Sequence, residues 1–174
     1  YGLRAMGGGP EALVESCPLP PGSLLDQCRS GGAYADCYVA EVGGTLSLAQ
    51  FIAAFYTTWV FRLERVILRW LASRPSTDSE ARMLASGEID AFAAWRVEDR
   101  REHEILLADF TGRTRSWLKT EPTPGAGSGT GGKDPRTRLY FGSAVIPVRD
   151  AATGRPTLGR RFSALLAFHK LYSR

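Results

Sequence analysis

The sequence contains little of what most catalytic and metal-binding sites require. It has only two histidines, His103 and His169, and no GxSxG or HExxH pattern, so serine-dependent acyl transfer and zinc-dependent hydrolysis have no signature here. Its three cysteines, Cys17, Cys28 and Cys37, match no zinc-ligand spacing. Three is also an odd number for a disulfide framework, so we expect free thiols in a reducing cytoplasm, no metal and no cofactor.

Long apolar segments and concentrated positive charge are absent as well. No run reaches the length of about eighteen apolar residues that a membrane-spanning helix needs, and residues 1–22 lack the basic-then-apolar order of a secretory signal. The net charge of +4 comes mainly from arginines spread through the chain. Because a nucleic-acid surface needs a basic stripe, we expect neither a nucleic-acid partner nor a membrane span.

The composition is that of an ordinary globular domain. A hydrophobic fraction of 44% and a charged fraction of 23% in 174 residues are sufficient for one buried core. We predict a flexible arm over residues 1–17 and a single domain over residues 18–174. Within it, the Gly-rich residues 123–135 are predicted to be a hairpin loop, and they lack the GxxxxGKS/T order of a phosphate-binding loop.

Helical periodicity is clearest in two segments. After the N-cap candidate Ser47, apolar residues recur at helical spacing over residues 48–74, and we expect a break near Thr57–Thr58. A short helix is predicted over residues 79–85, before Gly87. The last segment, residues 161–174, is predicted to be one long helix.

Alternating apolar and polar residues predict a series of strands, with a helical turn at residues 23–27 before the first of them. An antiparallel sheet must cover at least one face, and the helices are the available cover, which predicts an α+β domain. The predicted strands cover residues 34–42, 90–99, 103–110, 113–122 and 136–149.

Several segments in this order resemble a known superfamily. They are PLPPGSLLDQC, YADCYV, FRLERVILRW, DFTGRTRSWL and AFHKLYSR, spread over residues 18–174. Together they resemble a bacterial domain family of unknown function within the START-like, or SRPBCC, superfamily. The resemblance implies a helix-grip fold, in which a curved antiparallel sheet wraps around a long C-terminal helix and two or three helices follow the first strand. The superfamily includes lipid and hormone binders, polyketide cyclases and chaperone-cofactor domains.

A helix-grip domain would place a cavity between the concave sheet face and the last helix. Small-molecule pockets are mostly apolar with a few placed polar groups, so a small hydrophobic or amphipathic ligand is the expected partner. The same residues would also make a filled core, and both alternatives stay open. The predicted lining is Trp95, Val97, Leu106, Leu118, Phe141, Ser143 and Val145 from the sheet, with Phe162, Leu165, Leu166 and His169 from the helix.

Two other functions remain open. A cyclase or hydratase would need a polar cluster in the cavity, and His169, Asp109 and Arg115 are the candidates because they can exchange protons or hold charge. Asp109 could instead form an ion pair within its hairpin. A protein-interaction module would use an exposed face carrying Trp117 and Tyr140, since such residues anchor interfaces.

Overall fold

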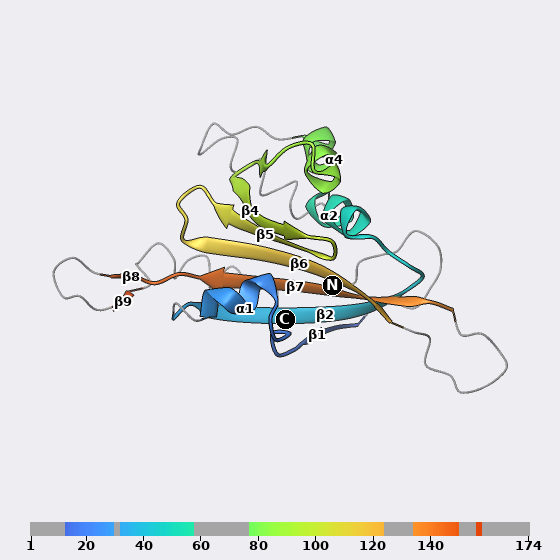
Figure 1. Ribbon diagram of the computed structural model, residues 1–174, viewed down its shortest axis with the longest axis horizontal. Coiled ribbons are helices and arrows are strands. Elements are labelled where there is room, and N and C mark those ends of the chain that lie inside the picture. The colour runs from blue at the N-terminus through green and yellow to red at the C-terminus, as the bar shows by residue number, and fades with distance from the viewer. Residues whose placement is uncertain (1–12, 30–31, 58–76, 124–133, 150–155, 158–174) are drawn as a thin grey trace.

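The computed structural model describes residues 13–29, 32–57, 77–123, 134–149 and 156–157. These residues form an α+β structure with a curved, entirely antiparallel seven-stranded sheet (Figure 1). The strand order is β1-β2-β7-β6-β5-β4-β3, so the first long strand pairs with the last one. Strand β2 precedes two of the helices in the chain and β7 follows them, yet the two strands are neighbours in one sheet.

The described helices are α1 (Leu24–Arg29), α2 (Leu48–Thr57) and α4 (Asp78–Ser86). The sheet consists of β1 (Val14–Ser16), β2 (Tyr34–Gly43), β3 (Ala91–Phe92), β4 (Trp95–Arg101), β5 (Glu104–Asp109), β6 (Thr114–Thr123) and β7 (Arg136–Val145). A separate two-stranded sheet pairs β8 (Val148–Arg149) with β9 (Pro156–Thr157).

Each face of the sheet carries a cluster of buried residues, and we call the two faces face A and face B. Face A carries Ile105, Leu107 and Leu118 and is covered by α2 and α4. Face B carries Leu106 and Trp117 and is covered by α1. Because successive side chains of a strand point to opposite faces, β5 supplies both cores, and all its residues except Asp109 are buried.

Helices α2 and α4 both begin at side chains that satisfy free backbone N–H groups. Ser47 Oγ accepts from the Gln50 backbone N–H at 3.2 Å, and Gln50 Oε1 accepts from the Ser47 N–H at 2.9 Å. Thr77 and Glu80 form the same reciprocal capping box at α4. Helix α4 ends at Gly87, whose φ of 82° is a left-handed conformation that glycine adopts without strain.

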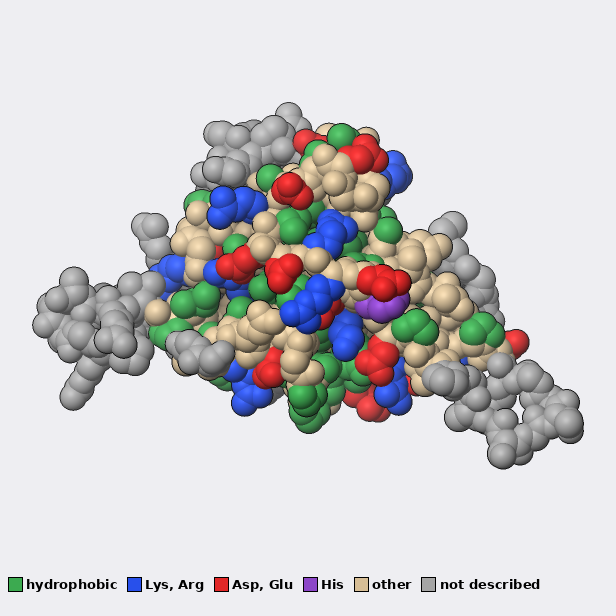
Figure 2. All heavy atoms as spheres, viewed as in Figure 1, with side chains coloured by type: hydrophobic (Ala, Val, Ile, Leu, Met, Phe, Trp, Pro, Cys, Tyr) green, Lys and Arg blue, Asp and Glu red, His purple; other side chains and the backbone are tan. Residues whose placement is uncertain are grey.

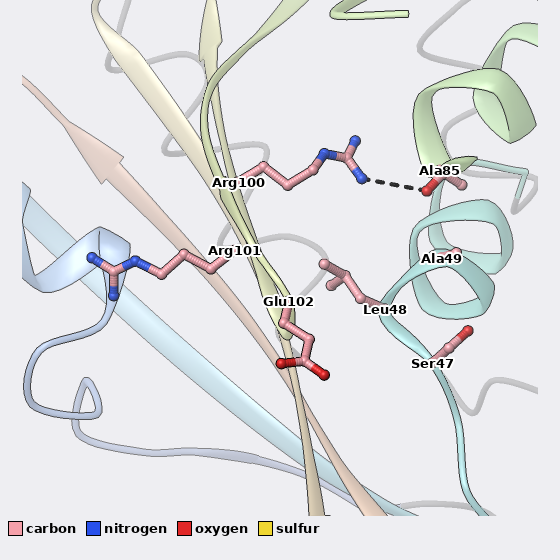
Figure 3. Close-up of a pocket in the computed structure, with 7 residues that line it drawn as sticks. All are labelled: Ser47, Leu48, Ala49, Ala85, Arg100, Arg101 and Glu102. Atoms are coloured by element: carbon pink, nitrogen blue, oxygen red, sulfur yellow. Dashed lines mark hydrogen bonds between the residues drawn. The ribbon is translucent and has the colours of Figure 1, made fainter. Parts of the chain in front are cut away.

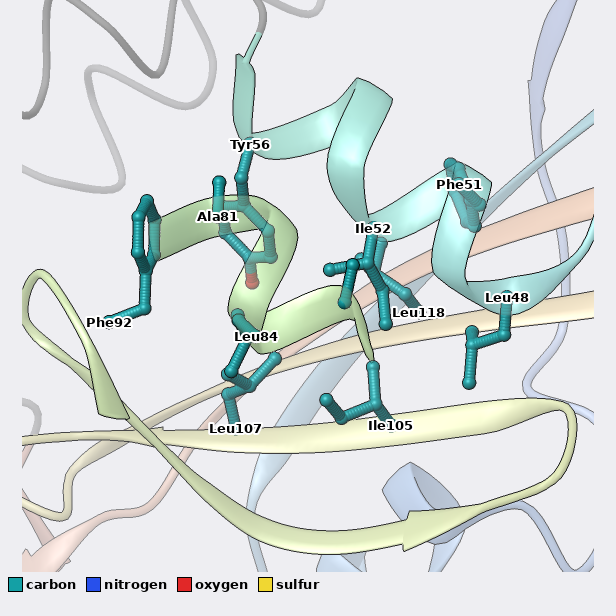
Figure 4. Packing of buried hydrophobic residues seen from close by; sticks show 11 residues of the cluster. Leu48, Phe51, Ile52, Tyr56, Ala81, Leu84, Phe92, Ile105, Leu107 and Leu118 are labelled. Carbon is teal, nitrogen blue, oxygen red and sulfur yellow. The ribbon is translucent and has the colours of Figure 1, made fainter. Parts of the chain in front are cut away.

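The face A core forms where these two helices meet the strands. Ile52 and Tyr56 of α2 and Leu84 of α4 are fully buried against the sheet. Figure 4 shows their side chains directed toward Ile105 and Leu107 of β5. The half of face A formed by β4, β5 and β6 is therefore filled with helix side chains.

On face B, a buried carboxylate holds α1 against the sheet. Glu104 Oε2 accepts from the Leu24 backbone N–H at 2.9 Å and from Trp117 Nε1 at 2.8 Å, while Arg101 Nη1 lies 3.0 Å from Glu104 Oε1. Trp117 and Leu24 are fully buried, and Glu104 is 7% exposed. The charge is thus taken out of water together with three donors, as burial of a carboxylate requires.

Several predicted elements are confirmed. The first strand, the helix from residue 48 as far as Thr57 and the helix ended by Gly87 are present. The turn predicted at residues 23–27 is α1. The predicted continuation through residues 58–74, most of the Gly-rich loop and the terminal helix lie outside the described residues.

Other boundaries were wrong. The strand predicted over residues 90–99 is two strands, β3 and β4, separated by a turn in which Ala93 has a φ of 52°; because this turn contains no glycine or asparagine, the sequence carries no signal for it. The strand predicted to reach Arg149 ends at Val145, ahead of Pro147, which has no N–H to continue a ladder. Strand β1, in the part of the chain assigned to a flexible arm, was not predicted.

Replacing Gly142 with alanine should destabilise the fold by about 1–3 kcal/mol, because overpacking forces neighbouring groups to move. A Cβ there would lie 2.5 Å from Leu25 Cδ2 and 2.9 Å from the Asp36 carbonyl oxygen. Gly43→Ala is the matched control, since nothing lies within 4 Å of its added Cβ. Urea unfolding measures both variants, and equal midpoints would contradict the close packing of α1 on β7.

Glu104→Ala should cost about 3 kcal/mol in the free energy of unfolding, because it leaves two buried N–H donors, on Leu24 and Trp117, without their acceptor. Glu102→Ala is the control: its side chain is 88% exposed, and such surface changes usually stay within about 0.5 kcal/mol. Chemical denaturation followed by Trp fluorescence compares the two, and a loss no larger than the control's would show that Glu104 does not hold α1.

Candidate functional site

One open hollow lies between the start of α2, the end of α4 and the β4–β5 turn (Figure 3). It has a volume of about 490 Å³ and is lined by Ser47, Leu48, Ala49, Ala85, Arg100, Arg101 and Glu102. Its charged side chains do not converge. Arg100 donates to the Leu84 and Ala85 carbonyls at 2.5 and 3.3 Å. Arg101 extends in the opposite direction from Arg100 (Figure 3), and it pairs with Glu104.

Burial lowers the pKa of Arg100, and the negative charge of Asp90 partly opposes this effect. The guanidinium stabilises carbonyls in the last turn of α4, where a helix carbonyl lacks its usual partner four residues later. Arg101 is occupied by Glu104 and the Gly22 carbonyl. Both cations of the hollow therefore serve the fold, and we do not assign a ligand to it.

The stronger candidate is a line of polar side chains across face A, which we call the polar row: Asp36, Ser143, Ser116 and Tyr56. Asp36 of β2 lies opposite Ser143 of β7, and Ser143 lies opposite Ser116 of β6. Tyr56 reaches the row from α2. Strand register thus collects residues that are far apart in the chain into one line.

Hydrogen bonds join the members of the polar row in pairs. Ser143 donates to Asp36 Oδ1 from its hydroxyl at 2.7 Å and from its backbone N–H at 3.1 Å. The Tyr56 hydroxyl and Ser116 Oγ lie 3.3 Å apart. Opposed residues on one sheet face have Cβ atoms about 5 Å apart, so the two pairs are neighbours. Bonding of this kind offsets the cost of placing polar groups in an apolar face.

The two ends of the polar row differ in exposure. Tyr56 and Ser116 are buried beneath α2, at 0% and 5% exposure. Asp36 and Ser143 are only half-buried. The row therefore runs from the filled core under α2 to the half-buried pair of Asp36 and Ser143.

Aromatic side chains lie next to the polar row on the same face. Phe141 precedes Ser143 by two residues on β7 and faces Tyr38 of β2. Phe55 of α2 packs on Phe141 with ring centroids 4.9 Å apart. Phe141 and Tyr38 are half-buried, like Ser143. The β2–β7 half of face A thus combines an acceptor with an aromatic surface, which is the composition typical of a small-molecule site.

Most of the predicted sheet lining shares one face. Trp95, Val97, Leu118, Phe141, Ser143 and Val145 lie on face A by strand register. Leu106 does not: it pairs with Trp117 and packs in the face B core. Residues 103–110 were correctly predicted to contain a strand, but which side chains of β5 share a face with the other lining residues depends on strand pairing. Phe162, Leu165, Leu166 and His169 lie outside the described residues.

The predicted polar cluster is not assembled by the described residues. Asp109 accepts from the Arg113 and Thr114 backbone N–H groups at 2.8 and 2.9 Å and from the Thr111 hydroxyl, so it closes the β5–β6 turn. Arg115 pairs with Glu98 on face B. Asp109 is on face A, so the two candidates point to opposite sides of the sheet.

The predicted exposed aromatic face was wrong. Trp117 is fully buried and Tyr140 is 8% exposed, because α1 covers them. Burial also raises the pKa of Tyr140, with a smaller contribution from Glu121. These side chains are core residues of face B and are not available to a partner.

Asp36, Ser116 and Tyr56 were missed as site residues. The alternation of the first strand does place Asp36 on the same side as Tyr38. No pattern of neighbouring residues in the sequence shows that β2 pairs with β7. None shows that the Tyr56 side chain of α2 contacts Ser116 of β6.

The surface charge does not form a one-sign stripe on the face seen in Figure 2, where Lys and Arg alternate with Asp and Glu. Opposite charges also pair within the described residues, as in Arg115–Glu98 and Arg136–Glu41. Among the described residues, no group of three or more potential ligands is arranged to hold a metal ion. None of the described helices is long and apolar enough to cross a membrane.

Comparisons of this chain with protein-family models, with curated proteins and with solved structures found no match. The resemblance to START-like domains therefore remains a prediction.

A double-mutant cycle of Tyr56→Phe and Ser116→Ala should give a coupling energy of about 1 kcal/mol, the usual value of a buried hydrogen bond. Each single variant removes one hydroxyl and keeps the packing of α2 on β6. Thermal or urea unfolding of the four proteins supplies the cycle. Coupling below about 0.3 kcal/mol would mean that the two hydroxyls do not bond.

Proposed function

We propose that this protein binds a small amphipathic molecule on the β2–β7 half of face A. The observation that carries the proposal is the half-exposed end of the polar row, where Asp36 and Ser143 lie beside Phe141 and Tyr38. A carboxylate in such a setting attracts hydrogen-bond donors, and the rings offer area to an apolar body.

The chemistry of Asp36 narrows the ligand class. Asp36 Oδ1 accepts two bonds from Ser143, and an ionised carboxylate only accepts hydrogen bonds, so a ligand group that meets it must be a donor. A ligand hydroxyl, amide N–H or amine fits that role, whereas an anionic head group would be repelled. The expected molecule therefore carries a donor at one end and an apolar chain or ring system at the other.

The proposed fold around this site is the helix grip. A curved sheet whose first long strand pairs with its last, with helices between them in the chain, is compatible with it. In this arrangement residues 161–174 would form a helix over the β2–β7 half of face A, with Phe162, Leu165, Leu166 and His169 directed toward Phe141 and Ser143. The helices α2 and α4 fill the other half, so one ligand-sized space is the expectation.

An enzyme of the cyclase or hydratase type is not favoured, since Asp109 and Arg115 point to opposite faces of the sheet.

The binding proposal predicts selective recognition of a donor-bearing amphiphile. Nile red, a neutral apolar dye, should show saturable fluorescence enhancement with the full chain. Decanol should displace it better than decyl methyl ether, which has the same chain length but no hydroxyl donor. Asp36→Asn should weaken decanol binding about tenfold, because a bond to a charged acceptor is roughly 1.4 kcal/mol stronger than one to a neutral acceptor.

Asp36→Asn keeps an oxygen that can accept from Ser143, so the fold is expected to survive, and circular dichroism checks this. Asp134→Asn, an exposed carboxylate before β7, is the matched control and should leave both affinities unchanged. Absence of saturable dye binding would contradict a cavity on face A. Equal displacement by the alcohol and the ether would contradict the role of Asp36.

A further inference from the structure

Two thiols that are distant in the chain are in contact on face B. Cys17 Sγ and Cys37 Sγ lie 3.3 Å apart. Both cysteines are free, as is Cys28, the third one. The contact arises where the lead-in to α1 runs along the edge of the sheet beside β2.

Strand pairing brings the two residues directly opposite each other. Ser16 of β1 faces Tyr38 of β2, and the next backbone bond, from the Cys17 N–H to the Cys37 carbonyl at 2.9 Å, continues the ladder. Opposed residues in antiparallel strands have Cα atoms about 4.5–5.5 Å apart. That separation lies within the range of about 4.4–6.8 Å that disulfides span. The spacing of the two strands is therefore compatible with a disulfide between these residues.

The two thiols differ in reactivity. Cys37 is buried, at 4% exposure, while Cys17 is half-buried. Burial, first, and the hydrogen bond with Cys17, second, raise the pKa of Cys37 to about 12. Because the thiolate is the reactive form, an external oxidant meets Cys17 first, and Cys37 acts afterwards as the internal partner.

We propose that Cys17 and Cys37 are an oxidisable dithiol that closes to an intramolecular disulfide in the presence of a low-molecular-weight disulfide such as glutathione disulfide. The Cys17 thiolate attacks one sulfur of glutathione disulfide, the S–S bond of glutathione breaks, and one glutathione leaves as a thiolate that takes up a proton. Cys37 then gives its proton to solvent and attacks Cys17 Sγ, which releases the second glutathione. Two protein thiols are oxidised and one glutathione disulfide is reduced to two thiols.

The bond would link the edge of the sheet to the cover of face B. Cys17 lies seven residues before Leu24 in the sequence, and Leu24 and Leu25 pack over the face B core. A disulfide between β2 and this lead-in would limit how far α1 can separate from Trp117. The oxidised protein is therefore expected to keep face B closed under conditions where the reduced protein opens it.

The full chain, incubated in glutathione redox buffers of increasing oxidised fraction, should lose two hydrogen atoms by intact-mass measurement. Non-reducing peptide mapping should place the new bond between Cys17 and Cys37. Oxidation should raise the unfolding temperature by on the order of 10 °C, because the disulfide would close a loop between residues 20 positions apart in the unfolded chain. Dithiothreitol should reverse this increase. Cys28→Ser should behave as the wild type.

Cys17→Ser and Cys37→Ala should each lose both the mass change and the reversible thermal shift. The mapping is done on the wild-type chain, so the test does not depend on the folding of either variant. A bond that involves Cys28, a product that stops at glutathione adducts, or no change in mass would overturn the proposal.

Discussion

The hydrogen bonds accepted by the buried Glu104 carboxylate are the interaction on which the covering of face B depends. The carboxylate joins β5 to the start of α1 through the Leu24 N–H, to β6 through Trp117 Nε1 and to β4 through Arg101. A buried charge without partners costs several kcal/mol, so α1 and its lead-in must remain on face B to satisfy it. With α1 in place, face B is filled, and the half-buried, partly polar surface of the sheet lies on face A.

Face A is itself divided into two parts. Under α2 and α4 the strands carry aliphatic residues and form a close-packed core. Toward β2 and β7, Asp36 and Ser143 stand beside half-buried aromatic rings. The polar row connects the two parts, because its Tyr56–Ser116 end is buried under α2 and its Asp36–Ser143 end is half-buried.

The errors of the sequence interpretation have a common physical cause. Leu106, Trp117 and Tyr140 were each placed correctly on alternating strands, yet assigned to the wrong surroundings. Alternation shows which residues of one strand share a side. Which face of the sheet that side belongs to follows from the pairing with the neighbouring strand. The short helix α1 covers face B, which would be exposed if helices packed on face A alone. Trp117 and Tyr140, which were expected at the surface, are therefore buried. The turn at Ala93 was not predicted, because its positive φ occurs at an alanine and not at a glycine.

The sequence by itself determined the local structure: the period-two strands, the capped helices α2 and α4, the α+β class and the shared side of Phe141, Ser143 and Val145. These features depend on neighbouring residues, whose periodicity and capping groups can be read along the chain. The tertiary structure alone decided that Asp36 meets Ser143, that Tyr56 meets Ser116 and that Cys17 touches Cys37. Each of these contacts joins segments 20 or more residues apart, and they form because burying both sheet faces selects one strand order and one register.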